Sequence, residues 1–503
     1  MRNILVLSLL LILSAVSYSQ IINYKEKHRP QFHFSPPAHW MNDPNGMVYY
    51  KGEYHLFYQY YPDSIVWGPM HWGHAISKDL VYWQNLPVAL SPDSLGYIFS
   101  GSVVVDKENT TGFQNGNENP LVALFTYHDS KKEKAGTADF QTQGMAYSLD
   151  KGRTWEKYEG NPVIKNQGNK DFRDPKVFWH QASKYWIMTL AVADRVEFYR
   201  SKNLKEWEFA GTFGKEEGSH GGVWECPDLI EMKIDKTGES KWVLIISVGT
   251  GAPNGGSGTQ YFVGHFDGKN FINDNPKQTV YWLDYGPDNY AGVTWSNVPN
   301  NKHLFIGWMS NWGYAQKVPT KNWRSAMTVA REITLKKTTE GYRLFTKPVK
   351  ALQQLRTFTQ PITSFKKIHS AKGLYEVNLN FNLIKSSAED FGVAFSNAKN
   401  EVIEVGFNKS KNQFYIDRTN AGDNSFAASF TGKNIAPRLL KNNNIKMHLL
   451  IDHSSVELFA DDGTVLMTAV FFPTQIFTDV QLFQQNGKAV LQAGFLHQLK
   501  SIW

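Results

Sequence analysis

Cysteine is nearly absent from this chain, in which Cys226 is the only one among 503 residues. A single cysteine cannot form an internal disulfide, so a small disulfide-stapled fold is excluded and stability has to come from buried apolar surface. Single domains seldom grow beyond about 250 to 300 residues, so the length predicts two separate cores.

Long hydrophobic runs are also scarce. The one candidate, Ile4 to Leu13, is too short to span a bilayer comfortably and follows the positive charge of Arg2. Ser17-Tyr18-Ser19 then ends in a small residue at which a signal peptidase could cut. We therefore predict a signal peptide over residues 1–19. The protein would be secreted or periplasmic, with no membrane insertion and no cysteine for a lipid anchor.

A concentrated charge of one sign is missing as well. The formal net charge is +7 at pH 7, but short basic clusters such as SKKEK are interrupted by acidic or polar neighbours. No segment forms the basic stripe that tracks a phosphate backbone, so no nucleic acid partner is expected. These charges are interpreted as a solvated surface.

The tryptophans that the chain does contain are unevenly distributed. Of the 16, all except Trp503 lie at or before Trp323, whereas the last third is rich in alternating valine, leucine, phenylalanine and asparagine. This shift predicts a first domain over residues 25–346 and a second over residues 360–503. Residues 347–359 would form a short helical or irregular linker.

A weak internal repeat marks the first domain. SKDLVYW begins at Ser77, SLDKGRTW at Ser148 and SKNLKEW at Ser201, and HFDGKNF at His265 is a degenerate fourth copy. The copies recur at intervals of roughly 50 to 70 residues, and each interval holds several short strand candidates, as in propeller blades. Helical periodicity is scarce, so we predict an all-β fold whose first domain is a five-bladed β-propeller.

The second domain has a clear strand pattern. In LYEVNLNFNL, apolar and polar residues alternate strictly, which predicts a strand with one buried face. Further strand candidates follow, two of them joined at Asp461-Asp462-Gly463. We predict a β-sandwich without a convincing acid-base pair. For this domain, covering and rigidifying the propeller is favoured over binding sugar independently. The apolar face consists of Tyr375, Val377, Leu379, Phe381 and Leu383.

Three acidic residues share an unusual setting. Asp43 in WMNDPNG, Asp174 in DFRDPKVFWH and Glu225 in VWECPDL each precede a proline by one or two positions and have aromatic neighbours. Each could be a plain turn or strand-end residue, and Asp-Pro-Asn-Gly is a nearly ideal turn sequence. Because proline restricts the backbone, the three side chains could instead be held so that they converge at a propeller channel. Converging carboxylates beside tryptophans suit glycoside hydrolysis.

Seven motifs in order resemble those of glycoside hydrolase family 32, the β-fructofuranosidases. They are WMNDPNG, FYQYYP, WGPMHWGHAISKDLVYW, FSGS, RDPKVFWH, WECPDL and SNWGYAQKVPTKNWRSAMT, and HSSVELFADDG resembles the family's C-terminal sandwich. Together they span nearly the whole predicted mature chain. They favour a chemical role for Asp43 over the plain turn.

The resemblance implies roles for the three carboxylates. Asp43 matches the nucleophile that attacks C2 of a fructosyl unit, giving a covalent intermediate and a retaining reaction. Glu225 matches the acid/base that protonates the leaving oxygen and then deprotonates water. Asp174 matches the transition-state stabiliser that binds fructose hydroxyls.

The resemblance also implies a substrate pocket and one departure from the family pattern. The usual Pro-Arg-Glu near the end of the propeller is Ala330-Arg331-Glu332 here. It lies away from the carboxylates in the sequence and leaves their assignment intact. The matched pocket positions are Asn42, Gln59, Trp67, Phe99, Ser100, Arg173 and Trp312.

Two further features are assigned no part in catalysis or metal binding. Cys226 could tune the proton affinity of Glu225, but packing as a small apolar residue is favoured. His71 and His74 are three residues apart, a spacing that does not converge on one ion in a strand or loop. No metal and no cofactor are predicted, because fructoside hydrolysis needs none.

Substrate and mode of attack remain open between alternatives. We expect hydrolysis of terminal β-D-fructofuranosyl linkages in levan, inulin or fructo-oligosaccharides, because SNWGYAQ is more similar to the fructan hydrolases of the family. An endo-levanase, an invertase acting mainly on sucrose, and fructosyl transfer are enzymatic alternatives. A fructan-binding protein without turnover is the non-enzymatic one, although both Asp43 and Glu225 are present.

Overall fold

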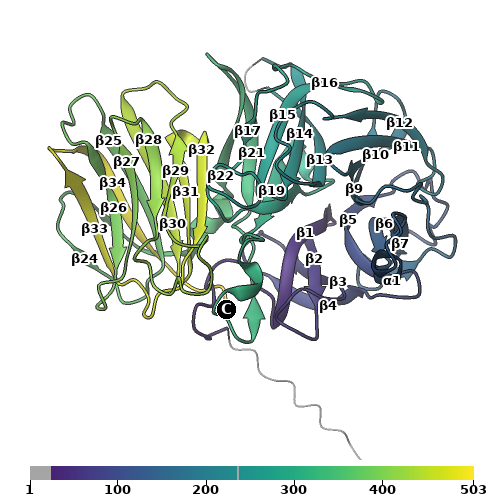
Figure 1. Cartoon of the computed structure of the whole chain (residues 1–503), viewed down its shortest axis with the longest axis horizontal. Helices are drawn as coiled ribbons and strands as arrows, with labels where there is room; N and C mark the ends of the chain where they lie inside the picture. Colours follow the sequence, from purple (N-terminus) through teal and green to yellow (C-terminus); the bar gives the residue numbers. More distant parts are fainter. Residues whose placement is uncertain (1–23, 235–236) are drawn as a thin grey trace, which may run out of the picture.

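The computed structural model describes residues 24–234 and 237–503, so the predicted signal peptide over residues 1–19 lies outside the described part. The fold consists almost entirely of strands, arranged as a ring of five sheets beside a pair of larger sheets (Figure 1). This is the predicted five-bladed β-propeller followed by a β-sandwich. In the described ranges, no helix has both the length and the apolar character needed to cross a membrane.

The five smaller sheets are the propeller blades. Blade 1 contains β1 (His39–Tyr50), β2 (Glu53–Tyr61), β3 (His71–Ser77), β4 (Gln84–Leu90) and the late strand β20 (Trp323–Arg324). Blade 2 contains β5 (Tyr97–Val105), β6 (Leu121–His128), β7 (Gln141–Ser148) and β8 (Glu156–Lys157). Blade 3 contains β9 (Phe172–His180), β10 (Tyr185–Val192), β11 (Arg195–Ser201) and β12 (Glu208–Phe213).

The remaining two blades complete the ring. Blade 4 contains β13 (Trp224–Lys233), β14 (Ser240–Val248), β15 (Gly258–Phe266), β16 (Phe271–Asn273) and β17 (Tyr281–Trp282). Blade 5 contains β18 (Tyr290–Thr294), β19 (His303–Trp308), β21 (Arg331–Thr338) and β22 (Gly341–Pro348). The first strand of each blade packs beside the first strand of the next, and β18 returns to β1. These five strands therefore surround the propeller axis.

The internal repeat is a turn between the third and fourth strands of a blade. Ser77, Ser148 and Ser201 end β3, β7 and β11, and the hydroxyl of each accepts a backbone N–H three or four residues later at 2.7 to 2.8 Å. Such local bonds satisfy amides that no strand pairs. The repeated serine thus marks the same corner in three successive blades.

The sandwich consists of two six-stranded sheets. One contains, in spatial order, β23 (Arg356–Pro361), β34 (Val490–Leu499), β25 (Tyr375–Asn382), β30 (Asn444–Asp452), β31 (Ser455–Ala460) and β32 (Val465–Val470). The other contains β24 (Ile368–His369), β33 (Asp479–Gln485), β26 (Asp390–Ser396), β27 (Val402–Asn408), β28 (Gln413–Asp417) and β29 (Lys433–Pro437).

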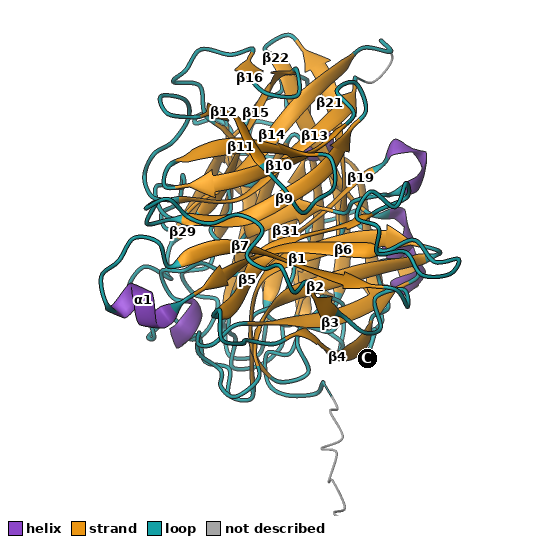
Figure 2. Ribbon diagram, turned by 90° about the vertical axis from the view of Figure 1, so that its right-hand side faces the viewer, coloured by secondary structure: helices purple, strands orange, loops and turns teal. Residues whose placement is uncertain are grey.

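Helices are short in the described ranges. The single α-helix α1 (Ser130–Lys134) projects from blade 2 (Figure 2). The 3-10 turns are η1 (Pro299–Asn301), η2 (Ala315–Lys317), η3 (Lys350–Leu355) and η4 (Asp461–Gly463).

The alternation predicted for β25 holds on its apolar face. Tyr375, Val377, Leu379 and Phe381 lie in the core between the two sheets, whereas Leu383 lies beyond the strand and is only partly buried. On the other face, Glu376 is also buried, because Arg356 binds both of its carboxylate oxygens at 2.6 Å. A paired carboxylate can be buried on a face that an alternating pattern marks as polar.

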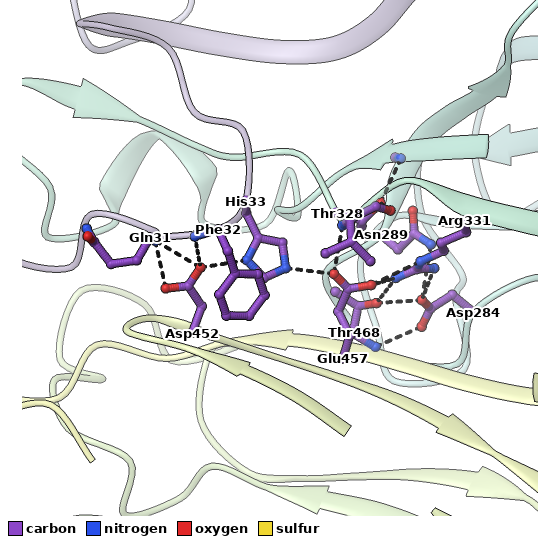
Figure 3. A network of polar contacts seen from close by, with 12 residues as sticks. Gln31, Phe32, His33, Asp284, Asn289, Thr328, Arg331, Asp452, Glu457 and Thr468 are labelled. Atoms are coloured by element: carbon purple, nitrogen blue, oxygen red, sulfur yellow. Dashed lines mark hydrogen bonds and ion pairs between the residues drawn. The ribbon is translucent and has the colours of Figure 1, made fainter. Parts of the chain in front are cut away.

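The propeller and the sandwich meet across buried charged groups (Figure 3). His33, just before β1, places Nδ1 2.8 Å from Asp452 and Nε2 2.8 Å from Glu457, both in the sandwich. Arg331 of β21 donates to Glu457 at 2.5 and 3.0 Å, and to Asp284 at 3.1 Å. Arg331 belongs to the triplet that departs from the family pattern, and it holds the two domains together.

We predict that His33 makes the stability of the interface dependent on pH. Burial lowers its pKa, but the bonds to Asp452 and Glu457 outweigh burial and raise the pKa from 6.5 to about 9. The stabilisation is therefore complete below about 6.5 and is lost as the pH rises through about 9. The melting temperature of the wild type should fall over this range, and His33→Ala should lack that component.

His369→Ala is the matched control, because this sandwich histidine also binds a carboxylate but its side chain is 69% exposed. The control should keep the pH dependence of the wild type. The prediction would be contradicted if the melting temperatures of His33→Ala and of the wild type changed with pH by the same amount from pH 6 to 10.

Candidate active site

The three acidic residues lie on the first strands of blades 1, 3 and 4, which surround the propeller axis. Each lies where strand pairing is interrupted. In β1 the pairing with β2 skips Asp43. In β9 the pairing with β10 skips both Asp174 and Pro175. In β13 the pairing with β14 skips Cys226 and Pro227, directly after Glu225. Proline lacks the N–H needed for a regular ladder, and a bulge turns the local side chain out of the strand's alternation.

Backbone dihedrals mark the same three places. Asp43 has φ +21°, Asp174 has φ +65° and Cys226, next to Glu225, has φ +49°. These values lie in or near the left-handed region, which costs free energy for residues with a Cβ. The bulges therefore direct the carboxylates into the axis at the expense of local backbone stability.

The three carboxylates share one cavity of about 290 Å³. All ten residues expected at the site line it, so the fold brings together every one of them. Beside Asp43, Asp174 and Glu225, these are Asn42, Gln59, Trp67, Phe99, Ser100, Arg173 and Trp312.

Asp43 lies close to other negative charges. Ser100 donates to its Oδ2 at 3.2 Å, and its Oδ1 is buried without a partner among the described residues. Burial, and then the charges of Glu225 and Asp174, raise its pKa from 3.8 to about 7. A carboxylate with an unpaired buried oxygen is available for reaction.

Asp174 is held more firmly. The backbone N–H of Cys226 donates to its Oδ2 at 3.0 Å, and its own N–H donates to Thr126 at 3.0 Å. Burial raises its pKa to about 6, assisted by the charge of Glu225 and opposed by Arg173. The bonds fix the direction of its carboxylate across the cavity.

Both oxygens of Glu225 are held by side chains. Arg173 Nε donates to Oε1 at 3.0 Å, and the Tyr290 hydroxyl donates to Oε2 in a short contact. Arg173 also binds Asp171 at 2.6 Å, and the surrounding carboxylates raise the pKa of its guanidinium. The arginine thus links Glu225 to the wall of the cavity.

Aromatic rings line one side of the cavity. The rings of Trp67 and Phe99 meet edge to face with centroids 6.0 Å apart. Phe99 stacks on His128 at 4.3 Å, and His128 Nε2 lies 3.0 Å from Glu133 of α1. This side offers apolar ring faces to a sugar, with a polar rim behind them.

Several lining or contacting residues were not expected from the sequence. Tyr290 carries no local signal, because its role depends on the approach of β18 to β13. His128 and Glu133 come from the end of β6 and from α1, and both line the cavity. Asp171 lies only two residues before Arg173, so its closeness to the RDP motif was a signal in the sequence that it belongs to the site.

Cys226 packs in the core as expected and also supports the site. Its side chain is buried in a cluster with Met41 and Tyr290, and burial raises the pKa of the thiol well above its usual value. The neutral Sγ lies 3.6 Å from Asp174 Oδ2. The histidines of β3 make separate contacts, His71 with the Pro69 carbonyl and His74 with His55.

Comparisons with known proteins match both domains to one family. Residues 33–348 match the N-terminal domain of glycosyl hydrolases family 32, and residues 342–498 match the family's C-terminal domain. The levanase of Bacillus subtilis (strain 168) is 50% identical over 492 residues, covering 95% of this chain and 72% of the levanase. The extracellular exo-inulinase of Aspergillus awamori is 38% identical over 530 residues, covering 98% of each chain.

A solved structure extends the similarity to the whole fold. The crystal structure of exo-inulinase from Aspergillus awamori superposes with a TM-score of 0.89 at 36% identity, covering 96% of this chain and 100% of that one. The two domain matches cover most of the chain in family order. This chain therefore belongs to glycosyl hydrolase family 32.

Proposed function

We propose that this protein is an exported, retaining β-fructosidase that removes terminal fructosyl units from fructans by hydrolysis. One observation carries the proposal: the carboxylates of Asp43, Asp174 and Glu225 share a cavity of about 290 Å³. A pocket of this size accepts a single sugar ring better than the middle of a chain. Export is supported by the pattern of residues 1–19 and by a relative described as extracellular.

In the first step, Asp43 attacks C2 of the terminal fructosyl unit. The bond from C2 to the bridging oxygen breaks, and Glu225 gives its proton to that oxygen as the remaining chain departs. The fructosyl unit is then held as an ester of Asp43. The unpaired Oδ1 of Asp43 is consistent with a nucleophile that carries few competing hydrogen bonds.

In the second step, water replaces the departed chain. Glu225 takes a proton from the water as its oxygen bonds to C2, and the bond to Asp43 breaks. Two displacements at C2 give net retention of configuration. Asp174, held by the Cys226 amide and by Thr126, binds fructose hydroxyls and opposes the positive charge that develops on the ring.

The crowding of three carboxyls explains how one of them can stay protonated. Like charges in one small cavity disfavour full ionisation, so the group retains a proton near neutral pH. Burial and the charge of Glu225 raise the pKa of Asp43 to about 7, so the shared proton is favoured on Asp43, whereas the first step needs it on Glu225 and the negative charge on Asp43. The proton therefore has to lie on Glu225 when C2 is attacked. The Tyr290 hydroxyl and Arg173 each donate to one Glu225 oxygen, so the side chain has a defined direction across the cavity.

The relatives support fructans as the substrate class. A levanase and exo-inulinases are among the proteins similar to this chain. Endo-levanase action, hydrolysis mainly of sucrose, transfer of fructose to another sugar, and binding without turnover are the alternatives. Exo hydrolysis is favoured because α1 and the rim residue Glu133 add a wall to the cavity.

We predict that fructose will be the first product released from levan and inulin. A pocket that admits one terminal ring cannot pass an internal segment, so oligosaccharides should not precede fructose. A time course on levan, inulin and sucrose, with products separated by size, measures this. An early ladder of oligosaccharides would indicate endo action, and rapid turnover of sucrose alone would indicate an invertase.

A second prediction separates the roles of Asp43 and Glu225. Asp43→Ala should abolish turnover of every fructoside, because no covalent intermediate can form. Glu225→Ala should lose about 10²- to 10⁴-fold on fructans, the usual contribution of general acid catalysis, and much less on β-D-fructofuranosyl fluoride. Glu225 is also the base of the second step, which both substrates share, so kcat/KM, which reports the first step, measures the difference between the two substrates. Equal losses on both substrates would exclude Glu225 as the acid.

A third prediction concerns the acidic limb of the pH profile. The charge of Glu225 contributes to the raised pKa of Asp43, which is about 7. Glu225→Gln removes that charge, so the pKa of Asp43 should fall and the acidic limb of kcat/KM on fructosyl fluoride should move to lower pH. Glu231→Gln is the control, since Glu231 is exposed on the same strand, and its limb should not move. If the acidic limb of kcat/KM did not move in Glu225→Gln, the titrations of Asp43 and Glu225 would not be coupled.

A further inference from the structure

A second cavity lies at the opposite end of the propeller axis. It has a volume of about 420 Å³ and is lined by the far ends of β5, β9 and β13, together with the residues at and just after the end of β18. On β9, for example, Asp174 faces the catalytic cavity, whereas Phe178 and Trp179 line the second one. The nearest lining residues on this strand are Asp174 of the catalytic cavity and Lys176 of the second one, which are two residues, or about 7 Å, apart along the strand.

The walls of this far cavity are rich in aromatic rings. Phe178 and Trp179 are partly exposed at its edge, and the largely buried Trp186 and Trp295 lie deeper. Trp179 meets Trp186 edge to face at 5.3 Å, and its indole N–H donates to Gln181 at 2.9 Å. Apolar cavities of 300 to 1,000 Å³ with a few convergent polar groups are typical of small-ligand sites.

The polar groups of the far cavity are a buried ion pair, Lys176 and Asp228. Asp228 is fully buried, and its Oδ2 accepts bonds from Lys176 Nζ at 3.1 Å and from the Thr294 hydroxyl at 2.7 Å. Its Oδ1 is buried without a partner among the described residues. Leaving a charged oxygen unpaired is costly, so a donor from outside the chain would stabilise it.

Lys176 offers the complementary group. Its ammonium carries three N–H donors, and two of them are used by Asp228 at 3.1 Å and the Thr294 carbonyl at 2.6 Å. The cavity therefore presents an acceptor and a donor side by side. A pair of neighbouring hydroxyls can donate to Asp228 and accept from Lys176.

Charge restricts the ligand further. Lys176 and Asp228 cancel, and the exposed rim residues Lys107 and Glu108 cancel as well. A cation would be repelled by Lys176 and an anion by Asp228, so neither is favoured over a neutral molecule. Neutral rings with apolar faces and adjacent hydroxyls fit both the aromatic walls and the polar floor.

We propose that the far cavity is a non-catalytic site for a neutral sugar unit, filled in this protein by a fructosyl unit of a fructan chain. The identity of the sugar rests on the proposed function, whereas the preference for a neutral polyol rests on the cavity alone. Since the two cavities open on opposite faces, a short oligosaccharide cannot reach both. A long chain, or a second chain of the same particle, can hold the enzyme near its substrate and raise the effective concentration.

The test uses full-length Asp43→Ala, in which turnover is blocked, and compares Trp179→Ala with Phe209→Ala added to it. Phe209 is also an exposed aromatic of blade 3, at 58%, but it does not line either cavity. Retardation in native gels containing levan, inulin or dextran measures binding to each polymer. The catalytic cavity contributes equally to both double variants, so a difference between them reports the far cavity.

We expect Trp179→Ala to weaken the apparent affinity for levan or inulin at least fivefold, and Phe209→Ala to leave it unchanged. Equal retardation of both double variants would overturn the proposal. Retardation by dextran that only Trp179→Ala removes would support a neutral-sugar site while overturning fructan as its ligand. Fructan hydrolysis by the wild type, measured separately, tests the proposed function.

Crystals of Asp43→Ala soaked with a fructo-oligosaccharide provide a measurement that does not depend on the folding of Trp179→Ala. A sugar ring should occupy the far cavity with a hydroxyl at Asp228 Oδ1. A ring in the catalytic cavity alone would overturn the proposal.

Discussion

The candidate active site depends on a strand bulge beside each of Pro44, Pro175 and Pro227. Each proline lies in the first strand of a blade beside a break in its ladder. The register skips Pro175 and Pro227 themselves, whereas Pro44 pairs with Tyr58 and the skipped residue is Asp43. At each break the strand bulges and an acidic side chain turns toward the propeller axis. The ring of first strands then brings three distant bulges to one point. The pocket, the crowded carboxylates and the chemistry proposed for them all follow from this arrangement.

Buried charge serves opposite purposes in two parts of the molecule. At the domain interface, every carboxylate has a cationic partner: Glu457 and Asp284 bind Arg331, and Asp452 binds His33. The pKa of Glu457 falls to about 2 as a result. In the catalytic cavity, like charges face one another and the pKa of Asp43 rises to about 7. Paired charges hold the sandwich against the propeller, whereas crowded carboxylates in the cavity oppose full ionisation of one another.

Much of the fold could be predicted because it rests on local patterns. The repeated serine turn marked the blades, since each hydroxyl bonds an amide only three or four residues away. Alternation marked β25, because neighbouring side chains in a strand face opposite ways. Glu376 escaped that rule because Arg356, twenty residues earlier in the chain, covers it. Tyr290, which holds Glu225 from another blade, had no local signal at all.

The sequence by itself determined the strand content, the blade turns, the two-domain division of composition, and the three Pro-linked acidic motifs with the family resemblance that they carry. Each of these depends on residues close together along the chain. Only the tertiary structure decided which oxygen of each carboxylate is bonded, how Arg331 joins the domains, and that Asp228 keeps an unpaired oxygen in a second cavity. Hydrogen bonds and desolvation act over a few ångströms between strands that are distant in sequence, so they exist only after the ring of blades has closed.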